Sequence, residues 1–316
     1  MNILFMGTPD FATASLAALL DAGKHVCAVV TQPDKARGRG MKVTFSDVKK
    51  FALEKELPVL QPETLKNGAF LPTLEEYKPD LIAVVAYGKI LPEYILNFPK
   101  YGCVNVHGSL LPKYRGAAPI QRAVLNGDSI SGVTTMRLDK GMDTGDMYLS
   151  EAVEIGENMT TGELFDTLAE IGGKLLVQTV DALENGSAKP LPQDHANATH
   201  ADKITPEECE VDFSLPARAV HNRIRGLSPF PGAFSHLDGK IVKLYDSRLN
   251  DETGEKAPCG TVLEASRDGV VIACGTGSVR LLSFKPEGKG VLSAADMVNG
   301  RKIAAGMRFE TGKDAQ

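Results

Sequence analysis

Tryptophan, paired cysteines and long apolar runs are all missing from this sequence of 316 residues. Its five cysteines are scattered and odd in number, which favours reduced thiols over a disulfide framework and leaves no CxxC pair to hold a metal. No apolar run approaches the roughly 20 residues that a membrane-spanning helix needs. The N-terminus lacks the basic segment of a signal peptide. We therefore expect a cytoplasmic protein with no membrane segment.

Strong charge of one sign is missing too. A net charge of −5 argues against a protein that coats nucleic acid through bulk charge, although a local basic patch can still bind one. The apolar fraction of 43% and the charged fraction of 24% are typical of an ordered globular chain. At about 100–200 residues per domain, the length predicts two domains.

The first half of the chain alternates strand-like and helical patterns. One helical pattern stops near Gly23, Ser46 can cap a second helix, and Thr160 with Glu163 has the spacing of a capping box before a long helix. The predicted strands are residues 3–6, 26–31, 80–86, 102–107 and 132–138. This alternation predicts an α/β domain with a doubly wound, mostly parallel sheet.

The pattern changes near residue 188. Residues 189–206 are polar and marked by prolines, which indicates a linker. A helical pattern over residues 217–225 is followed by short β-like runs at residues 241–245, 260–263, 270–274 and 279–284. These runs predict a small antiparallel β-barrel (OB-like) or sandwich. We thus expect a first domain over residues 1–188, the linker over 189–206, and a C-terminal OB-like domain over 207–316.

Asn105 and His107 are candidates for chemistry at the end of one predicted strand. Side chains alternate along a strand, so both point to one face, at the carboxyl end where open α/β sheets bind ligands. An amide beside an imidazole can stabilise a developing oxyanion, and an imidazole can titrate near neutral pH. The alternative is an ordinary turn asparagine and a core histidine.

The loop at residues 139–146 adds a candidate carboxylate. Two glycines bracket Asp143 and let the backbone turn sharply beside a ligand. The carboxylate could hold the imidazole or move a proton through water. A calcium loop is disfavoured, because the spacing differs from that motif and its distal glutamate is missing. Plain turn chemistry for the aspartates stays open.

Several motifs, in the expected order, resemble the formyltransferase family. Residues 109–112 with 114–116 are similar to its folate-site signature, and Asn105, His107 and Asp143 match its catalytic Asn, His and Asp. The resemblance runs from residue 2 into the C-terminal region. Further similar stretches are residues 5–12, 32–34, 37–40, 86–92 and 222–227.

This resemblance implies formyl transfer from 10-formyltetrahydrofolate, a co-substrate, to the α-amine of initiator methionyl-tRNA. The products would be N-formylmethionyl-tRNA, used in translation initiation, and tetrahydrofolate. Asn105 and His107 would stabilise the tetrahedral oxyanion, while Asp143 would orient the imidazole and help relay the amine proton. No metal or nucleophilic side chain is required, and we expect a monomer. The chain departs from the family at Ser228 and Phe230, where Asn and Trp are frequent.

Two loops would hold the pterin through backbone groups, again by resemblance. On the residues alone, 110–112 could equally be an apolar loop over the core. The expected folate-binding residues are Ala86, Tyr87, Gly88, Ile90, Leu91, Ser109, Leu110, Leu111 and Pro112.

A basic loop with several glycines follows the second predicted strand. It could reach phosphate oxygens of the tRNA acceptor stem, although such a loop is usually just solvated. Its expected tRNA-binding residues are Lys35, Arg37, Arg39 and Lys42. The OB-like domain could add contacts, since that fold commonly binds nucleic acid. Its candidates are Arg218, Arg223, Arg225, Lys240 and Lys243.

Rival functions stay open at this point. A folate-dependent formyltransferase on a small amine, or a formyltetrahydrofolate hydrolase, would need neither the C-terminal domain nor the basic loop. A nucleotide-dependent oxidoreductase is disfavoured, because residues 7–10 are not a GxGxxG fingerprint. A non-catalytic RNA-binding protein is disfavoured by the intact Asn105, His107 and Asp143.

Overall fold

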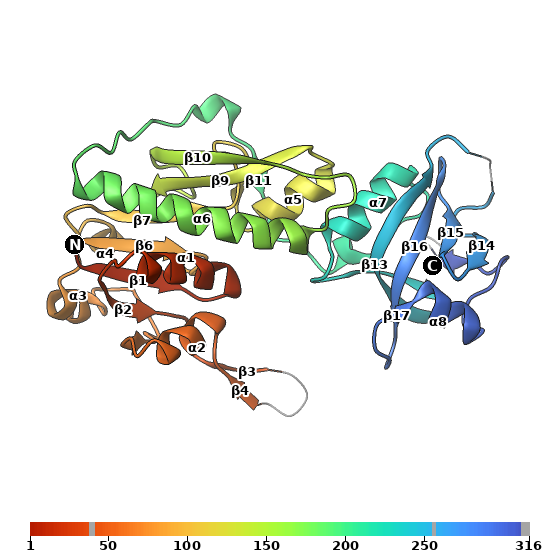
Figure 1. The fold of residues 1–316 in the computed structure, drawn as a ribbon, viewed down its shortest axis with the longest axis horizontal. Coiled ribbons are helices and arrows are strands. Elements are labelled where there is room, and N and C mark those ends of the chain that lie inside the picture. Colours follow the sequence, from red (N-terminus) through yellow and green to blue (C-terminus); the bar gives the residue numbers. More distant parts are fainter. Residues whose placement is uncertain (38–41, 255–256, 311–316) are drawn as a thin grey trace. The chain divides into compact units, whose positions relative to one another are not determined.

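The chain forms two compact units in the computed structural model, which describes residues 1–37, 42–254 and 257–310 (Figure 1). The N-terminal unit comprises Met1–Pro119, Ser131–Val153 and Phe165–Ala201. The C-terminal unit comprises Ile120–Ile130, Glu154–Leu164 and Asp202–Gln316. The domain limits expected at residues 188 and 207 stay predictions. Within the described ranges, no helix is long and apolar enough to cross a membrane.

A seven-stranded sheet forms the centre of the N-terminal unit. Its order is β10-β9-β7-β6-β1-β2-β5, with the strands from β7 to β5 parallel and β9 antiparallel to β7. The predicted doubly wound, mostly parallel sheet is confirmed. The strands are β1 (Ile3–Gly7), β2 (Val26–Val30), β5 (Val59–Leu60), β6 (Leu81–Val85), β7 (Cys103–His107), β9 (Ile130–Arg137) and β10 (Met147–Glu154).

Helices cover both faces of this sheet. On one face, Leu4 of β1 belongs to a buried apolar cluster with Leu74 of α3 and Ile95 of α4. On the other face, α1 and α6 lie side by side, with the rings of Phe11 and Phe165 5.0 Å apart (Figure 1). The helices of this unit are α1 (Asp10–Asp21), α2 (Asp47–Glu54), α3 (Leu71–Tyr77), α4 (Glu93–Leu96) and α6 (Thr161–Glu184). The first turn of α6 belongs to the C-terminal unit, as does α5 (Pro119–Asn126) from Ile120 onward.

The predicted helix starts are confirmed at two positions. Ser46 caps α2 by accepting a hydrogen bond from the Lys49 N–H at 3.2 Å. At α6, the Thr160 N–H donates to the Glu163 carboxylate at 2.8 Å, and the Glu163 N–H donates back to the Thr160 hydroxyl at 3.2 Å. These bonds hold the pKa of Glu163 below its usual range and complete the capping box.

The C-terminal unit is built on a curled antiparallel sheet of order β14-β15-β16-β13-β12-β18. A backbone bridge between Thr261 and Arg308 brings the two edges of the sheet together. One apolar core fills the inside, with Phe213, Phe284 and Phe309 fully buried. The predicted antiparallel, barrel-like architecture is confirmed. Its elements are α7 (Ala217–Gly226), β12 (Ala233–Leu237), β13 (Lys240–Asp251), β14 (Val262–Ser266), β15 (Gly269–Ala273), β16 (Ser278–Pro286), β17 (Leu292–Ser293), α8 (Ala294–Asn299) and β18 (Phe309–Glu310).

Several short strands could not be predicted from the sequence patterns. The antiparallel hairpin of β3 (Lys35–Arg37) and β4 (Lys42–Thr44) lies where only a loop was expected. β8 (Arg115–Gly116) pairs in parallel with β11 (His200–Ala201), so the segment predicted as a linker contributes a strand to the N-terminal unit. Such two- and three-residue strands carry no apolar periodicity to detect.

Candidate active site

β7 carries Asn105 and His107 to the carboxyl edge of the parallel sheet. Asn105 pairs with Val84 of β6, and His107 pairs with Thr134 of β9. Strand alternation sets both side chains on the face opposite Val106, which contacts α6. Asn105 is half-buried, and among the described residues its side-chain amide has no hydrogen-bond partner. The amide is therefore available to a ligand.

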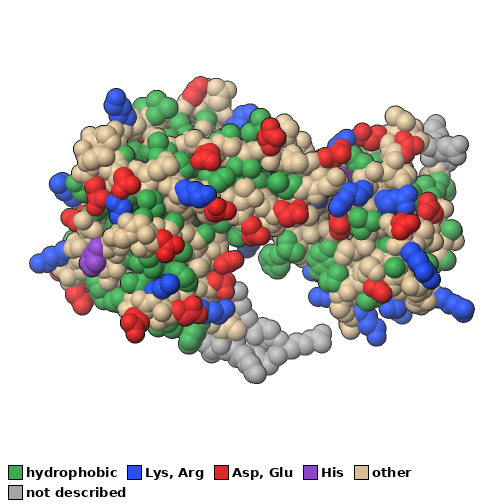
Figure 2. Space-filling view, in the orientation of Figure 1, with side chains coloured by type: hydrophobic (Ala, Val, Ile, Leu, Met, Phe, Trp, Pro, Cys, Tyr) green, Lys and Arg blue, Asp and Glu red, His purple; other side chains and the backbone are tan. Residues whose placement is uncertain are grey.

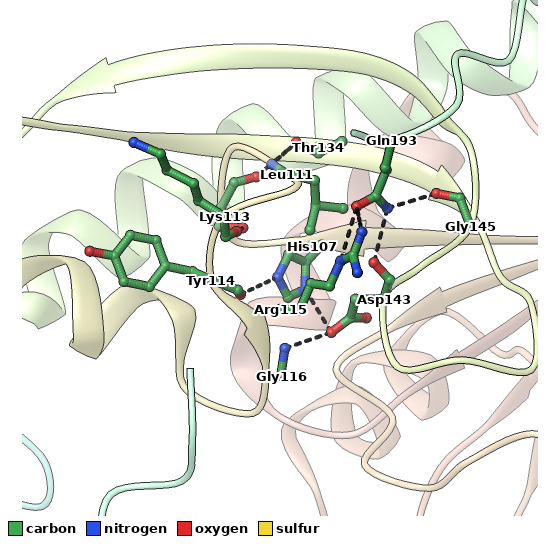
Figure 3. A network of polar contacts seen from close by, with 11 residues as sticks. His107, Leu111, Lys113, Tyr114, Arg115, Gly116, Thr134, Asp143, Gly145 and Gln193 are labelled. Atoms are coloured by element: carbon green, nitrogen blue, oxygen red, sulfur yellow. Dashed lines mark hydrogen bonds and ion pairs between the residues drawn. The ribbon is translucent and has the colours of Figure 1, made fainter. Parts of the chain in front are cut away.

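The imidazole of His107 is held in one orientation. Its Nε2 lies 2.9 Å from the carbonyl oxygen of Tyr114, and because that oxygen can only accept, Nε2 donates. Nδ1 then faces a carboxylate oxygen of Asp143 at 3.7 Å (Figure 3). The His107 side chain is 6% exposed and that of Asp143 is 15% exposed. Nδ1 is thus the nitrogen that can meet a substrate atom or exchange a proton beside Asp143.

Asp143 occupies a sharp turn between β9 and β10. Its φ is +55°, a conformation that costs free energy in a residue other than glycine. The flanking Gly145 has no room for a side chain, since a Cβ there would overlap the carbonyl of Arg137. The Gly116 N–H donates at 2.8 Å to the same carboxylate oxygen that faces the imidazole. The carboxylate is therefore anchored by the backbone.

Arg115 and Gln193 form a buried polar pair behind this turn, and both are 5% exposed. The Gln193 side chain donates to the carbonyl oxygens of Asp143 at 2.9 Å and Gly145 at 2.7 Å. Neither residue could be identified from the sequence as part of the site, because Arg115 lies within the family signature and Gln193 lies within the expected linker. A single glutamine in a polar stretch gives no signal that it will be buried.

The first loop expected to bind folate follows β6. Ala86 and Gly88 have φ values of +45° and +78°, so the backbone reverses sharply there. Tyr87 is buried, and burial raises the pKa of Tyr87 to about 12. Its hydroxyl is enclosed and has no hydrogen-bond partner among the described residues. Ile90 is exposed and Leu91 is buried. Backbone groups of this loop, rather than the Tyr87 hydroxyl, are therefore the groups offered to a ligand.

The second expected folate loop follows β7 and is braced by β9. The Thr134 hydroxyl donates to the Ser109 carbonyl at 2.8 Å and accepts from the Leu111 N–H at 3.2 Å. Ser109 and Leu111 are buried, whereas Leu110 and Pro112 are partly exposed. The loop thus has a defined backbone position next to His107 (Figure 3).

A cavity of about 420 Å³ opens at the carboxyl edge of the sheet. The loops after β1, β2 and β6 line it together with the start of α2. Its volume lies within the range of about 300–1,000 Å³ typical of small-molecule sites. Its polar lining residues include Thr8, Gln32, Asp34, Ser46, Asp47 and Lys50.

The basic segment expected to bind tRNA forms the β3–β4 hairpin. Lys35 pairs with Thr44 and Arg37 pairs with Lys42 across it. Figure 1 shows the hairpin extending from the edge of the N-terminal unit. Arg39 lies outside the described residues. The described basic positions therefore share one two-stranded ribbon.

The basic candidates of the C-terminal unit differ in what they contact. Arg225 is buried and donates to two backbone carbonyls, and burial lowers its pKa. Arg218 forms ion pairs with two glutamates. Arg223 and Lys243 donate to carbonyl oxygens, and Lys240 is exposed.

This fold and site define a class of enzyme, one that transfers an acyl group directly between two bound substrates. Both ring nitrogens of His107 face oxygen acceptors rather than a hydroxyl or thiol nucleophile, which separates the site from covalent acyl-enzyme chemistry. In the described part of the chain, no three His, Cys, Asp or Glu side chains come together as a metal site would require. The chain belongs to the formyl transferase family: the Formyl transferase model matches residues 1–180, and its C-terminal domain model matches residues 203–302.

Two relatives that match over nearly the whole chain share one name. The methionyl-tRNA formyltransferase of Caldanaerobacter subterraneus subsp. tengcongensis is 47% identical, covering 97% of this chain and 99% of the relative. That of Desulforamulus reducens is 45% identical, covering 99% of each.

Solved structures show the same fold at lower identity. A sugar 3N-formyl transferase, solved with dTDP and 5-N-formyl-THF, has a TM-score of 0.65 at 21% identity and covers 92% of this chain and 99% of its own. The methionyl-tRNA formyltransferase of Clostridium thermocellum has a TM-score of 0.53 at 19% identity, covering 79% and 94% respectively.

Proposed function

We propose that this protein transfers the formyl group of 10-formyltetrahydrofolate to the α-amine of initiator methionyl-tRNA. The observation that carries the proposal is the match of 45–47% identity, over almost the full length, to relatives titled methionyl-tRNA formyltransferase. The site of the N-terminal unit supports it, because its amide, imidazole and carboxylate are the groups that a direct acyl transfer uses.

The reaction replaces one carbon–nitrogen bond with another. The amine nitrogen attacks the formyl carbon, and the carbonyl oxygen becomes an oxyanion. The bond from that carbon to N10 of the folate then breaks, and the proton lost by the amine ends on N10. The Asn105 amide would donate to the oxyanion, and such a donor is typically worth about 2.7–4 kcal/mol. His107 Nδ1, anchored beside Asp143, would relay the proton.

Two further sites complete the proposal. The loops at residues 86–91 and 109–112 would bind the pterin through their backbone groups. The β3–β4 hairpin would contact tRNA phosphates through Lys35, Arg37, Arg39 and Lys42, while the exposed Lys240 of the C-terminal unit could add a contact. On the face drawn in Figure 2, acidic and basic side chains are interspersed over the N-terminal unit, so recognition would be local.

Acceptor choice is the test of this proposal. Purified protein is incubated with 10-formyltetrahydrofolate and either initiator methionyl-tRNA, free methionine, a nucleotide-linked amino sugar, or no acceptor. We expect N-formylmethionyl-tRNA to be the dominant product. Product from a small amine alone would instead establish a small-molecule formyltransferase, and folate hydrolysis without any acceptor would establish a hydrolase.

Size-exclusion chromatography and cell fractionation test the expected monomer and its cytoplasmic location.

A further inference from the structure

Gln193 reaches the Asp143 turn from a distant part of the sequence. It follows α6 by nine residues and lies just before the 3-10 turn at His195–Asn197, yet its amide bridges two carbonyls of the turn that carries Asp143. Figure 3 shows the Gln193 side chain between Arg115 and the 143–145 backbone.

The two ends of the Gln193 side chain have opposite partners. Its nitrogen faces the carbonyls of Asp143 and Gly145, while its oxygen accepts from Nε of Arg115 at 3.1 Å and from a terminal guanidinium nitrogen at 2.7 Å. A guanidinium has donors only and a carbonyl accepts only. These partners fix which way round the amide sits, and a carboxylate could satisfy only the Arg115 side.

Asp143 needs such support because its own conformation is costly. Its φ of +55° persists only when surrounding contacts over-determine it. Gly116, the neighbour of Arg115, holds the carboxylate through its N–H, and Gln193 holds the carbonyl of the same residue. Asp139 braces the turn from within by accepting from the Gly141 N–H and the Thr144 hydroxyl. The β8 segment and Gln193 thus fix Asp143 from two sides.

We propose that Gln193, oriented by Arg115, is a positioning residue that sets the Asp143 carboxylate against His107 for the transfer step. The inference rests on the proposed function for its kinetic readout only. Gln193 touches neither the imidazole nor the carboxylate oxygens, so it acts through the backbone of the turn.

Gln193→Glu is the discriminating variant. The new carboxylate keeps both bonds to Arg115, so the buried guanidinium remains paired and the fold remains stable. It places an oxygen, however, against the carbonyls of Asp143 and Gly145. We expect kcat to fall at least tenfold while KM for the formyl donor and for methionyl-tRNA stays within twofold. We also expect faster amide hydrogen exchange in residues 139–146, with unchanged exchange in the C-terminal unit.

A matched control removes a buried polar bond elsewhere in the same unit. Thr179 is fully buried in α6; its hydroxyl donates to the Leu175 carbonyl at 2.8 Å and lies 2.8 Å from the hydroxyl of Thr135 in β9. Thr179→Val should leave both kcat and exchange of the 139–146 turn unchanged within twofold. Gln193→Ala also removes both hydrogen bonds from Arg115 to the Gln193 oxygen, so it should lower both kcat and thermal stability.

Three results would overturn the proposal. The first is a Gln193→Glu protein whose kcat is within twofold of the wild type. The second is unchanged amide exchange in residues 139–146. The third is failure to fold, which would mean that the amide is needed for folding rather than for positioning Asp143. Failure of the proposed function is distinguishable, because it would appear as absence of formylmethionyl-tRNA with the wild-type protein. The exchange measurement would remain valid in that case.

Discussion

Asn105 and His107 stand two residues apart, and their surroundings assign them different tasks. The imidazole is locked by the Tyr114 carbonyl on one nitrogen and faces Asp143 with the other. The Asn105 amide has no hydrogen-bond partner among the residues described, and so remains free to meet a developing negative charge. At the residue scale, we therefore propose that Asn105 stabilises the developing charge while His107 relays the proton.

Asn105→Ala tests the first of these tasks. Removing a single oxyanion donor should lower kcat by about 10²–10³-fold and leave KM for both substrates nearly unchanged, because the donor acts mainly in the transition state. Steady-state kinetics with methionyl-tRNA provide the measurement. Asn97→Ala, at an exposed position after α4, is the matched control and should have full activity. A loss confined to KM would mean that Asn105 only binds substrate.

At the level of single elements, the sequence predicted the helices and strands whose buried residues recur with a regular period. The structure contains the two strands predicted from the all-apolar runs of β1 and β6. It also contains the helix start predicted from the capping box of Thr160 and Glu163. The edge strand β10 was not predicted, because its residues are mostly exposed and show no apolar pattern. Gln193 could not be predicted at all, because its burial depends on where the chain after α6 returns to the Asp143 turn. Non-local hydrogen bonds leave no trace in local periodicity.

Close packing of α6 on β7, the strand of Asn105 and His107, yields a second prediction. A Cβ added at Gly172 would lie 2.8 Å from Cγ1 of the buried, stiff Val106. Gly172→Ala should gain about 1 kcal/mol in helix propensity but lose about 1–3 kcal/mol through overpacking, for a net destabilisation. Urea unfolding measures it. Gly156→Ala, with no contact closer than 3.9 Å, is the control and should change stability little.

The β3–β4 hairpin carries a prediction about RNA. Arg37→Ala or Lys42→Ala should raise KM for methionyl-tRNA and reduce by about one the slope of log affinity against log salt, because one phosphate contact is lost. Filter binding over a salt series measures the slope. Lys66→Ala removes an exposed lysine elsewhere on the N-terminal unit and should leave the slope unchanged. Equal effects of both substitutions would remove the hairpin from the RNA interface.

At the scale of the whole molecule, acid stability depends on charge pairs such as that of Arg122 and Glu208 in the C-terminal unit. Their hydrogen-bonded ion pair lowers the pKa of Glu208 to about 2, against about 4.3 for an unfolded chain. Because the folded pKa is the lower one, its stabilising contribution is complete above about pH 5 and is lost as pH falls towards 2. Solvent screening of this partly exposed pair limits the contribution to about 1 kcal/mol.

Glu208→Gln should therefore flatten the loss of stability between about pH 5 and 2 without altering formyl transfer at neutral pH. Thermal unfolding of the wild type and the variant across this range measures the difference. Identical pH profiles would show that the ion pair does not stabilise the folded state.

The proposed formyl transfer depends on the pairing of His107 with Asp143, which lie 3.7 Å apart and are anchored by Gly116 and Gln193. Its most direct test is the single-turnover rate of Asp143→Asn with saturating 10-formyltetrahydrofolate and methionyl-tRNA, alongside folate affinity by fluorescence titration. An amide keeps the size of the carboxylate but lacks the negative charge that supports the imidazole while it relays the proton, so the rate should fall by about 10²–10⁴-fold. Folate affinity should stay within about twofold of the wild type. A rate near that of the wild type would contradict the account.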